Sequence, residues 1–289
     1  MSVRIIPRLD IKGPNLVKGV HLEGLRVLGK PERFARHYYE QGADELFYMD
    51  TVASLYERNS LLDIIERTAR EIFIPLTVGG GLRSTEDISL ALRAGADKVA
   101  INTAAIARPE LISEAARRFG SSTIVVSIEA VKRPDGSYEA LTDFGRQSTG
   151  VDAIAWARRA EELGAGELVV ISIDREGTGE GYDLELTGRI ARAVSIPVIA
   201  LGGAGSVDHV LEVIEQGAAD AVSLASVLHY NFIKCADCLG EDYSAEGNLT
   251  FLRGRANGFN KIADATLPQV KRHLLAHGVP CRWEEGWAA

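Results

Sequence analysis

Short apolar runs rich in β-branched residues alternate along this chain with longer stretches whose apolar residues recur at helical spacing. The short runs predict strands at 4–9, 45–50, 76–78, 98–101, 123–128, 167–173, 198–200 and 221–224. The longer stretches predict helices at 31–41, 61–70, 85–94, 109–119, 153–163, 183–193 and 207–216. Regular alternation of strands with helices is typical of a parallel sheet, either open or closed into a barrel.

The second half of the chain repeats the pattern of the first. The sequence GADEL at 42–46 returns as GAGEL at 164–168, and the Ile-Pro pair at 74–75 returns at 196–197, each 122 residues later. This ordered agreement predicts a duplicated half-barrel, that is, an α/β fold of the (βα)8 TIM-barrel type built from two similar halves. The alternative is that unrelated α/β segments share the same turn chemistry.

A polar stretch interrupts the repeat near the C-terminus. Residues 240–258 are rich in Gly, Asn, Glu and Ser, and a helical pattern that would close the barrel resumes at 262–277. We therefore interpret 231–260 as a loop insertion in the last βα connection of a single domain that spans 1–289.

Four potential metal ligands lie in or after this insertion: Cys235, Cys238, His273 and His277. Such residues bind structural zinc, but the 34 residues between the cysteine pair and the histidine pair exceed ordinary zinc-finger spacing. Free cysteines and surface histidines are the alternative, and the sequence leaves both open.

Composition narrows the class of protein. With 32 Lys and Arg against 40 Asp and Glu, the net charge of −8 argues against a general nucleic-acid surface but allows a local cationic pocket for a phosphorylated metabolite. No apolar run approaches the roughly 20 residues that span a bilayer, and charges interrupt any signal-peptide core. Three cysteines are too few for a disulfide scaffold, so we expect a cytoplasmic protein.

Polar residues stand at the ends of most predicted strands: Asp10, Asp50, Asn102, Thr103, Glu129, Asp174 and Glu176. In a (βα)8 barrel, catalytic residues come from the C-terminal ends of the strands. Asp10 and Glu129 end the first and fifth strands, which face each other across such a barrel. Two opposed carboxyls suit general acid–base chemistry on a substrate between them. The alternative is that both only cap loops or pair with Lys12 or Lys132.

Glycine-rich strand ends occur once in each half. Gly81 and Gly203 each lie just before a serine and a helical pattern, where backbone N–H groups and a helix N-terminus favour an oxyanion. Asn102-Thr103 and Ala225-Ser226 end the following strands. Each half thus offers a phosphate cradle, and the pair predicts an elongated substrate with a phosphate at each end.

Seven motifs together carry a family resemblance: RLDIK at 8–12, VKG at 17–19, VGGG at 78–81, AINTA at 100–104, SIDREGT at 172–178, GYD at 181–183 and GGAG at 202–205. They resemble the cyclase subunit of imidazole glycerol phosphate synthase, the HisF family of histidine biosynthesis, over about 3–230 and 262–283. The resemblance implies an ammonia-using cyclase/lyase acting on a bisphosphorylated ribulosyl aminoimidazole substrate. It also implies ammonia from a glutaminase subunit in a heterodimeric glutamine amidotransferase complex, with no metal or redox cofactor.

The resemblance also implies roles for individual residues. Asp10 is the general acid, and the position of Glu129 holds the partner base. Lys18 lies on a flexible loop after the first strand and contacts phosphate. The remaining substrate and phosphate contacts are Asp50, Gly81, Asn102, Thr103, Glu176, Gly177, Gly203, Ala225 and Ser226.

At the opposite end of the barrel, the resemblance implies a ring of charged residues at an ammonia entrance: Arg4, Glu45, Lys98 and Glu167. All four begin predicted strands, so inward projection would make a salt-bridged plug, with the glutaminase docked over it. The alternative is a charge layer that only stabilises the bottom of the barrel.

Three residues depart from the family pattern. Glu129 and Glu176 stand where the family has aspartates, and Ile171 replaces a threonine. An extra methylene displaces a carboxylate by about an ångström or more, which is enough to alter catalysis. Because these departures lie at the substrate end only, the alternative function is a HisF-like paralogue that channels ammonia, with a glutaminase partner, to a sugar amidotransferase in surface-polysaccharide biosynthesis.

Overall fold

The computed structural model describes residues 2–51, 61–235, 262–284 and 286. Eight parallel strands close into a barrel, because β1 pairs with both β4 and β12. In order around the barrel the strands are β1 (Arg4–Lys12), β4 (Leu46–Asp50), β5 (Leu76–Gly79), β6 (Lys98–Ile101), β7 (Ile124–Lys132), β10 (Glu167–Ser172), β11 (Val198–Leu201) and β12 (Ala221–Leu224). The (βα)8 fold expected from the sequence is confirmed.

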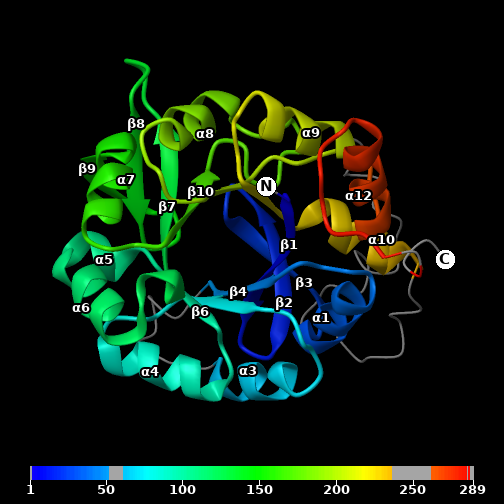
Figure 1. Ribbon diagram of the computed structural model, residues 1–289, viewed down its shortest axis with the longest axis horizontal. Helices are drawn as coiled ribbons and strands as arrows, with labels where there is room; N and C mark the ends of the chain where they lie inside the picture. Colours follow the sequence, from blue (N-terminus) through cyan, green and yellow to red (C-terminus); the bar gives the residue numbers. More distant parts are fainter. Residues whose placement is uncertain (1, 52–60, 236–261, 285, 287–289) are drawn as a thin grey trace.

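Helices surround the strands on all sides, as the view along the barrel shows (Figure 1). The described helices are α1 (Pro31–Glu40), α3 (Leu62–Ala69), α4 (Thr85–Ala94), α5 (Thr103–Ala107), α6 (Glu110–Phe119), α7 (Ala153–Glu162), α8 (Leu184–Ala191), α9 (Val207–Glu215), α10 (Ser226–Cys235) and α12 (Leu267–Ala276), with a short 3-10 turn, η1 (Ser121–Thr123). The serines after the two glycine-rich turns, Ser84 and Ser206, both cap helices: each side chain accepts a backbone N–H of the first turn.

Alternation along the strands sorts side chains between two apolar layers. On β1, Ile5, Leu9 and Ile11 pack outward in the cluster formed with the helices, whereas Ile6 belongs to the cluster that fills the barrel. Since successive side chains of a strand point to opposite faces, the even-numbered residues of β1 point inward. The same rule points Val125 and Glu129 of β7 into the barrel.

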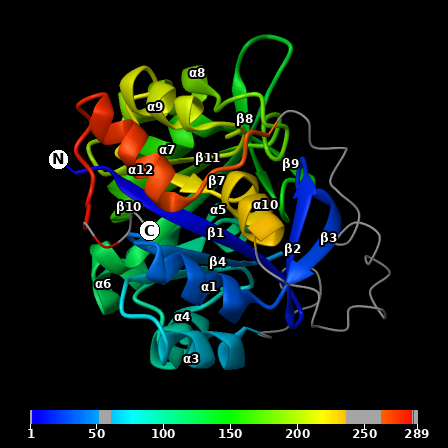
Figure 2. The ribbon, with the colours of Figure 1, turned by 90° about the vertical axis from the view of Figure 1, so that its right-hand side faces the viewer.

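Two β-hairpins extend the barrel at one end and were not predicted. The first barrel strand continues into β2 (Asn15–Val20) and β3 (Glu23–Gly29), and the fifth, β7, continues into β8 (Tyr138–Thr142) and β9 (Gln147–Asp152). Figure 2 shows β2 and β3 at the end of the barrel away from the N-terminus. The hairpins follow equivalent strands of the two halves, so the internal repeat includes them.

The hairpin turns fold over the mouth of the barrel. Each turn holds two successive non-glycine residues with positive φ, His21 and Leu22 in the first and Asp143 and Phe144 in the second. Leu22 and Phe144 are buried in the apolar cluster inside the barrel. The two turns therefore cover the C-terminal mouth from opposite sides.

The C-terminal segment returns to the start of the chain. Helix α12 packs against α9, and Val3 forms a parallel bridge with Cys281. Residues 231–235 of the expected insertion form the end of α10, and the rest of it lies outside the described residues.

The structure describes the side chains of only the two histidines among the four potential zinc ligands, so the zinc hypothesis is not tested. Cys238 lies outside the described residues. His273 Nε2 is 3.1 Å from a carboxylate oxygen of Asp208, and His277 Nδ1 is 2.9 Å from the carbonyl oxygen of His273. Within 2–51, 61–235, 262–284 and 286, no group of three or more His, Cys, Asp or Glu side chains is arranged to hold a metal ion.

Candidate active site

Asp10 and Glu129 lie on diametrically opposite strands, since four steps around the barrel separate β1 from β7 in either direction. Both side chains are buried, and both lie within their strands rather than at the ends, because the strands continue into the hairpins. Neither pairs with the lysines considered as an alternative: Lys12 is exposed, and Lys132 Nζ donates to Glu185 at 2.6 Å. The pairing with these lysines is therefore wrong.

The two carboxyls have different immediate partners. Asp10 Oδ1 accepts a hydrogen bond from Arg8 Nε at 2.7 Å, whereas Glu129 Oε2 accepts one from the backbone N–H of Gly145 at 2.7 Å. Burial raises the pKa of Glu129 to about 7, against the opposing effect of the Arg8 charge. Glu129 therefore exchanges a proton near neutral pH, as a catalytic acid or base must.

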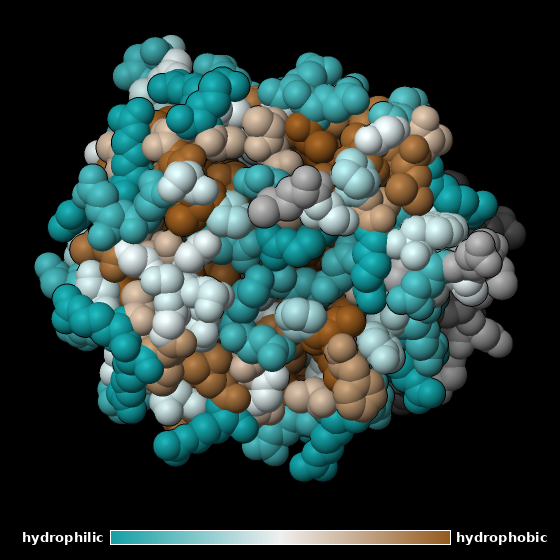
Figure 3. Space-filling model, in the orientation of Figure 1, coloured by the Kyte–Doolittle hydropathy of each residue, from teal (hydrophilic) through white to brown (hydrophobic). Residues whose placement is uncertain are grey.

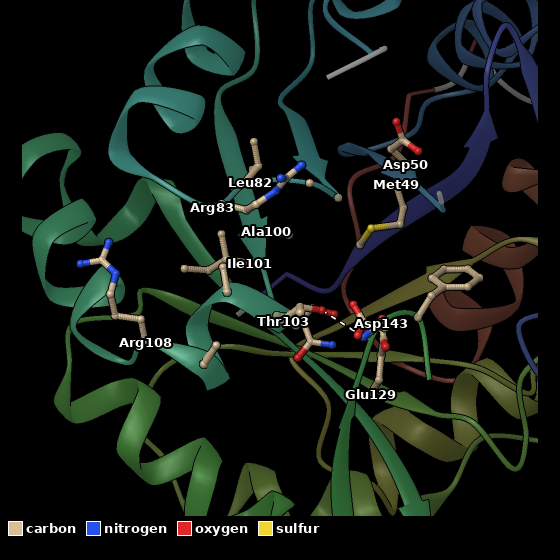
Figure 4. Close-up of a pocket in the computed structure, with 17 residues that line it drawn as sticks. Met49, Asp50, Leu82, Arg83, Ala100, Ile101, Thr103, Arg108, Glu129 and Asp143 are labelled. Atoms are coloured by element: carbon tan, nitrogen blue, oxygen red, sulfur yellow. Dashed lines mark hydrogen bonds between the residues drawn. The ribbon is translucent and has the colours of Figure 1, made fainter. Parts of the chain in front are cut away.

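The first predicted phosphate cradle lines a cavity of about 370 Å³ at the mouth. Gly81, Asn102, Thr103 and Asp50 all line it, and so does Glu129 (Figure 4). Gly81 has φ +72°, a conformation that favours glycine, and Thr103 Oγ1 accepts the backbone N–H of Asp143 at 3.0 Å. The structure thus brings this group of predicted residues together beside one of the two carboxyls.

The second predicted cradle lines a separate and much smaller cavity of about 20 Å³. Its lining includes Gly203, Ala225 and Ser226 of that cradle, together with three other predicted contacts, Lys18, Glu176 and Gly177. Lys18 is not on a flexible loop as expected: it lies in β2, is buried, and donates from Nζ to Glu176 Oε1. The loop expectation is wrong because residues 15–20 pair as a strand with both β1 and β3.

At the other end of the barrel, the four charged residues form a closed ring of ion pairs. Arg4 contacts both Glu45 and Glu167, and Lys98 Nζ contacts the same two carboxylates at 2.9 and 3.0 Å. The carboxylates are buried and the cations are partly exposed. Figure 3 views this end of the barrel, and hydrophilic side chains gather at its centre.

Arg8 was not recognised as a site residue from the sequence. It is almost fully buried, and its guanidinium lies over the ring of Phe47 at 5.7 Å from the centroid. The available signal was its position two residues before Asp10 on a predicted strand, which puts both side chains on the same face. Asp143 and Gly145 were missed because the second hairpin was missed.

The fold and the opposed carboxyls at the C-terminal mouth define the class: this is a (βα)8-barrel enzyme. Residues 4–234 match the family described as histidine biosynthesis protein, and the chain belongs to that family.

Similar proteins are named imidazole glycerol phosphate synthase subunit HisF. One from Legionella pneumophila is 60% identical over 207 residues, which cover 72% of this chain and 98% of the relative. One from Streptomyces coelicolor is 49% identical over 237 residues, 82% of this chain and 94% of the relative. One from Thermobifida fusca is 49% identical over 246 residues, 83% and 96% of the two chains. No helix in the described part of the chain is both long and apolar enough to cross a membrane.

Proposed function

We propose that this chain is the ammonia-using cyclase/lyase of imidazole glycerol phosphate synthase, acting on the bisphosphorylated ribulosyl aminoimidazole substrate. The observation that carries the proposal is the arrangement of the mouth: two buried carboxyls on opposite strands stand between two glycine-containing cradles. A substrate with a phosphate at each end spans such a site. The names of the relatives support the same activity.

The position of each site residue indicates whether it binds a phosphate or takes part in proton transfer. Gly81, Asn102 and Thr103 hold one phosphate, and backbone N–H groups at Gly177 and Gly203 with the Ser226 hydroxyl hold the other. Asp10 and Glu129 then lie at the reacting middle of the substrate. Attack of ammonia on a carbonyl carbon requires a proton on the departing oxygen and removal of a proton from nitrogen, which two carboxyls in opposite protonation states supply.

The partner follows from the other end of the barrel. We infer that a glutaminase subunit docks over the ring of Arg4, Glu45, Lys98 and Glu167 and delivers ammonia through it. Between the ring and the mouth the barrel is filled by apolar side chains, including Ile6, Val125 and Val169. An apolar interior admits neutral NH3 more readily than a hydrated ion.

We infer a cytoplasmic location, because three cysteines are too few for a disulfide scaffold.

Growth rescue of a histidine auxotroph lacking the cyclase tests the proposal. Rescue, together with turnover of the bisphosphorylated substrate by the purified protein and an ammonium salt, is the expected result. An Asp10→Asn variant is the matched control, because an amide cannot exchange the carboxyl proton, and it should not rescue. Folded protein that binds a glutaminase but gives neither rescue nor turnover would overturn the proposal in favour of the ammonia-channelling paralogue.

A further inference from the structure

Arg8 stands among the acidic groups of the mouth and has no role in the function described above. It is 1% exposed, and its Nη1 and Nη2 have no hydrogen-bond partner in the described part of the chain. Only Nε is engaged, by Asp10. Buried guanidinium nitrogens left without partners are costly, and proteins tolerate them where the charge itself is needed.

The charges around Arg8 form one buried cluster. Arg8 acts electrostatically on Asp10, Glu176 and Glu129, and Lys18 contacts Glu176. Two cations therefore face three carboxyls, all buried. A buried cluster is most stable without net charge, and this one is balanced when one carboxyl carries a proton.

The geometry decides which carboxyl is protonated. Asp10 has Arg8 and Glu176 has Lys18 in direct contact, whereas among the described residues Glu129 has only the Gly145 N–H. Burial disfavours the charged form of Glu129 most strongly, and Asp10 across the mouth and Asp143 from the second hairpin add to this effect, whereas the charge of Arg8 opposes it. Asp50 lines the same cavity. Glu129 is therefore the member that holds the proton.

We propose that Arg8 is a positioning residue that divides the two catalytic roles, holding Asp10 ionised as the general base and leaving Glu129 protonated as the general acid. This assignment is the reverse of the one implied by the family resemblance, and it rests on the proposed function. In the addition of ammonia, the C–N bond forms and the C=O π bond breaks. Glu129 gives its proton to the carbonyl oxygen, and Asp10 removes a proton from the nitrogen. The number of protons is thus balanced.

The first test is the pH profile of kcat/KM, with ammonium salts adjusted to keep the concentration of free NH3 constant. The alkaline limb of the wild type should fall near pH 7, where Glu129 loses its proton. Removing the cation in Arg8→Met disfavours the charged form of Glu129, so this alkaline limb should move to higher pH by at least one unit. Arg8→Lys keeps the charge and should move the limb less. Lower kcat with an unmoved alkaline limb in Arg8→Met would reduce Arg8 to a structural role and overturn the proposal.

The second test does not depend on turnover. Carbon-13 NMR of labelled glutamate carboxyl groups, with the Glu129 signal assigned by Glu129→Gln, should show Glu129 titrating near pH 7 in the free wild-type protein and higher in Arg8→Met. Titration in the ordinary glutamate range would overturn the proposal even if the enzyme is active. Titration near pH 7 without turnover of the bisphosphorylated substrate would overturn the proposed function but support the proton arrangement. The wild-type measurement suffices if Arg8→Met does not fold.

Discussion

Glu129 is the residue whose surroundings matter most for the chemistry of the mouth. Its carboxyl is buried, accepts the Gly145 N–H and contacts no cation in the described part of the chain. Such a group is more easily kept neutral than charged.

The raised pKa of Glu129 makes folding stability depend on pH in a predictable direction. A carboxyl whose folded-state pKa is about 7 stabilises the fold below its ordinary pKa, and this contribution is lost as the pH rises toward 7. Glu129→Gln removes the effect. The free energy of unfolding of the variant, relative to wild type, should therefore increase by about 2.5 kcal/mol between pH 5 and pH 8.

Urea unfolding at both pH values measures this difference. The same substitution at the exposed Glu110 is the control for the loss of a carboxyl, and there the difference should stay within about 0.5 kcal/mol. A constant difference for Glu129→Gln across the range would mean that Glu129 is ionised in the folded protein at every pH tested.

At the scale of elements, the two hairpins cover the C-terminal mouth of the barrel and contact the candidate active site. The tip of the second hairpin supplies the Gly145 N–H to Glu129 and the Asp143 N–H to Thr103, so it contacts one carboxyl and one cradle. The tip of the first packs Leu22 beside it: a Cβ added at Gly145 would lie 3.2 Å from Leu22 Cδ1. The hairpins therefore couple the two halves of the mouth.

Two glycines near this hairpin allow a matched test of that coupling. Gly145 and Gly150 have φ +75° and +73°, but an added Cβ meets side chains of the mouth only at Gly145. Alanine at either position should cost about 1 kcal/mol of stability because of the positive φ. Only Gly145→Ala should also lower kcat/KM, by about tenfold or more, by moving the hydrogen bond to Glu129. Equal activity of the two variants in steady-state assays would argue against coupling.

A second prediction at this scale concerns substrate binding in the two phosphate cradles. Thr103→Glu and Ser226→Glu each put a carboxylate into a cavity that we propose holds phosphate, so each should raise the KM for the bisphosphorylated substrate at least tenfold by repulsion and blockage. Thr103→Gln and Ser226→Gln add the same bulk without the charge and should raise it less. An unchanged KM in both glutamate variants would exclude the two-phosphate site.

At the scale of the whole molecule, the barrel has two chemically different ends. A ring of alternating cations and anions closes one end, the acidic mouth with its cradles occupies the other, and an apolar interior separates them. This polarity is expected of an enzyme that takes in a small neutral molecule at one end and uses it at the other.

Lys98→Met should distinguish the delivery of ammonia at one end of the barrel from the chemistry at the other end. Opening the ring should lower glutamine-dependent turnover in the complex with the glutaminase by about tenfold or more, while turnover with ammonium salts stays within about twofold, because the mouth is untouched. Arg36→Met, which removes a cation from an exposed pair with Glu40, is the control and should change neither. Equal losses with both nitrogen sources would mean that the ring only stabilises the barrel.

The sequence by itself determined the barrel and the strands on which Asp10 and Glu129 lie. Helical and strand periodicities with a 122-residue repeat are properties of the local chain, so they are visible before folding. Once eight strands close, the first and fifth must be opposite, which fixed Asp10 against Glu129. The hairpins escaped prediction because β2 and β3 pair with irregular register and lack clean alternation.

Only the tertiary structure decided how the charges of the mouth are paired. Lys18 and Glu176 form an ion pair although they are far apart along the chain. Arg8 pairs with Asp10 and not with Glu129 or Glu176, and this depends on the depth and direction of the side chains inside the closed barrel. Burial there removes water, which makes each contact decisive for protonation. A strand pattern specifies the face of the sheet to which a carboxyl points. The partner that this carboxyl contacts, and therefore whether it is protonated, is determined by residues brought together from across the fold.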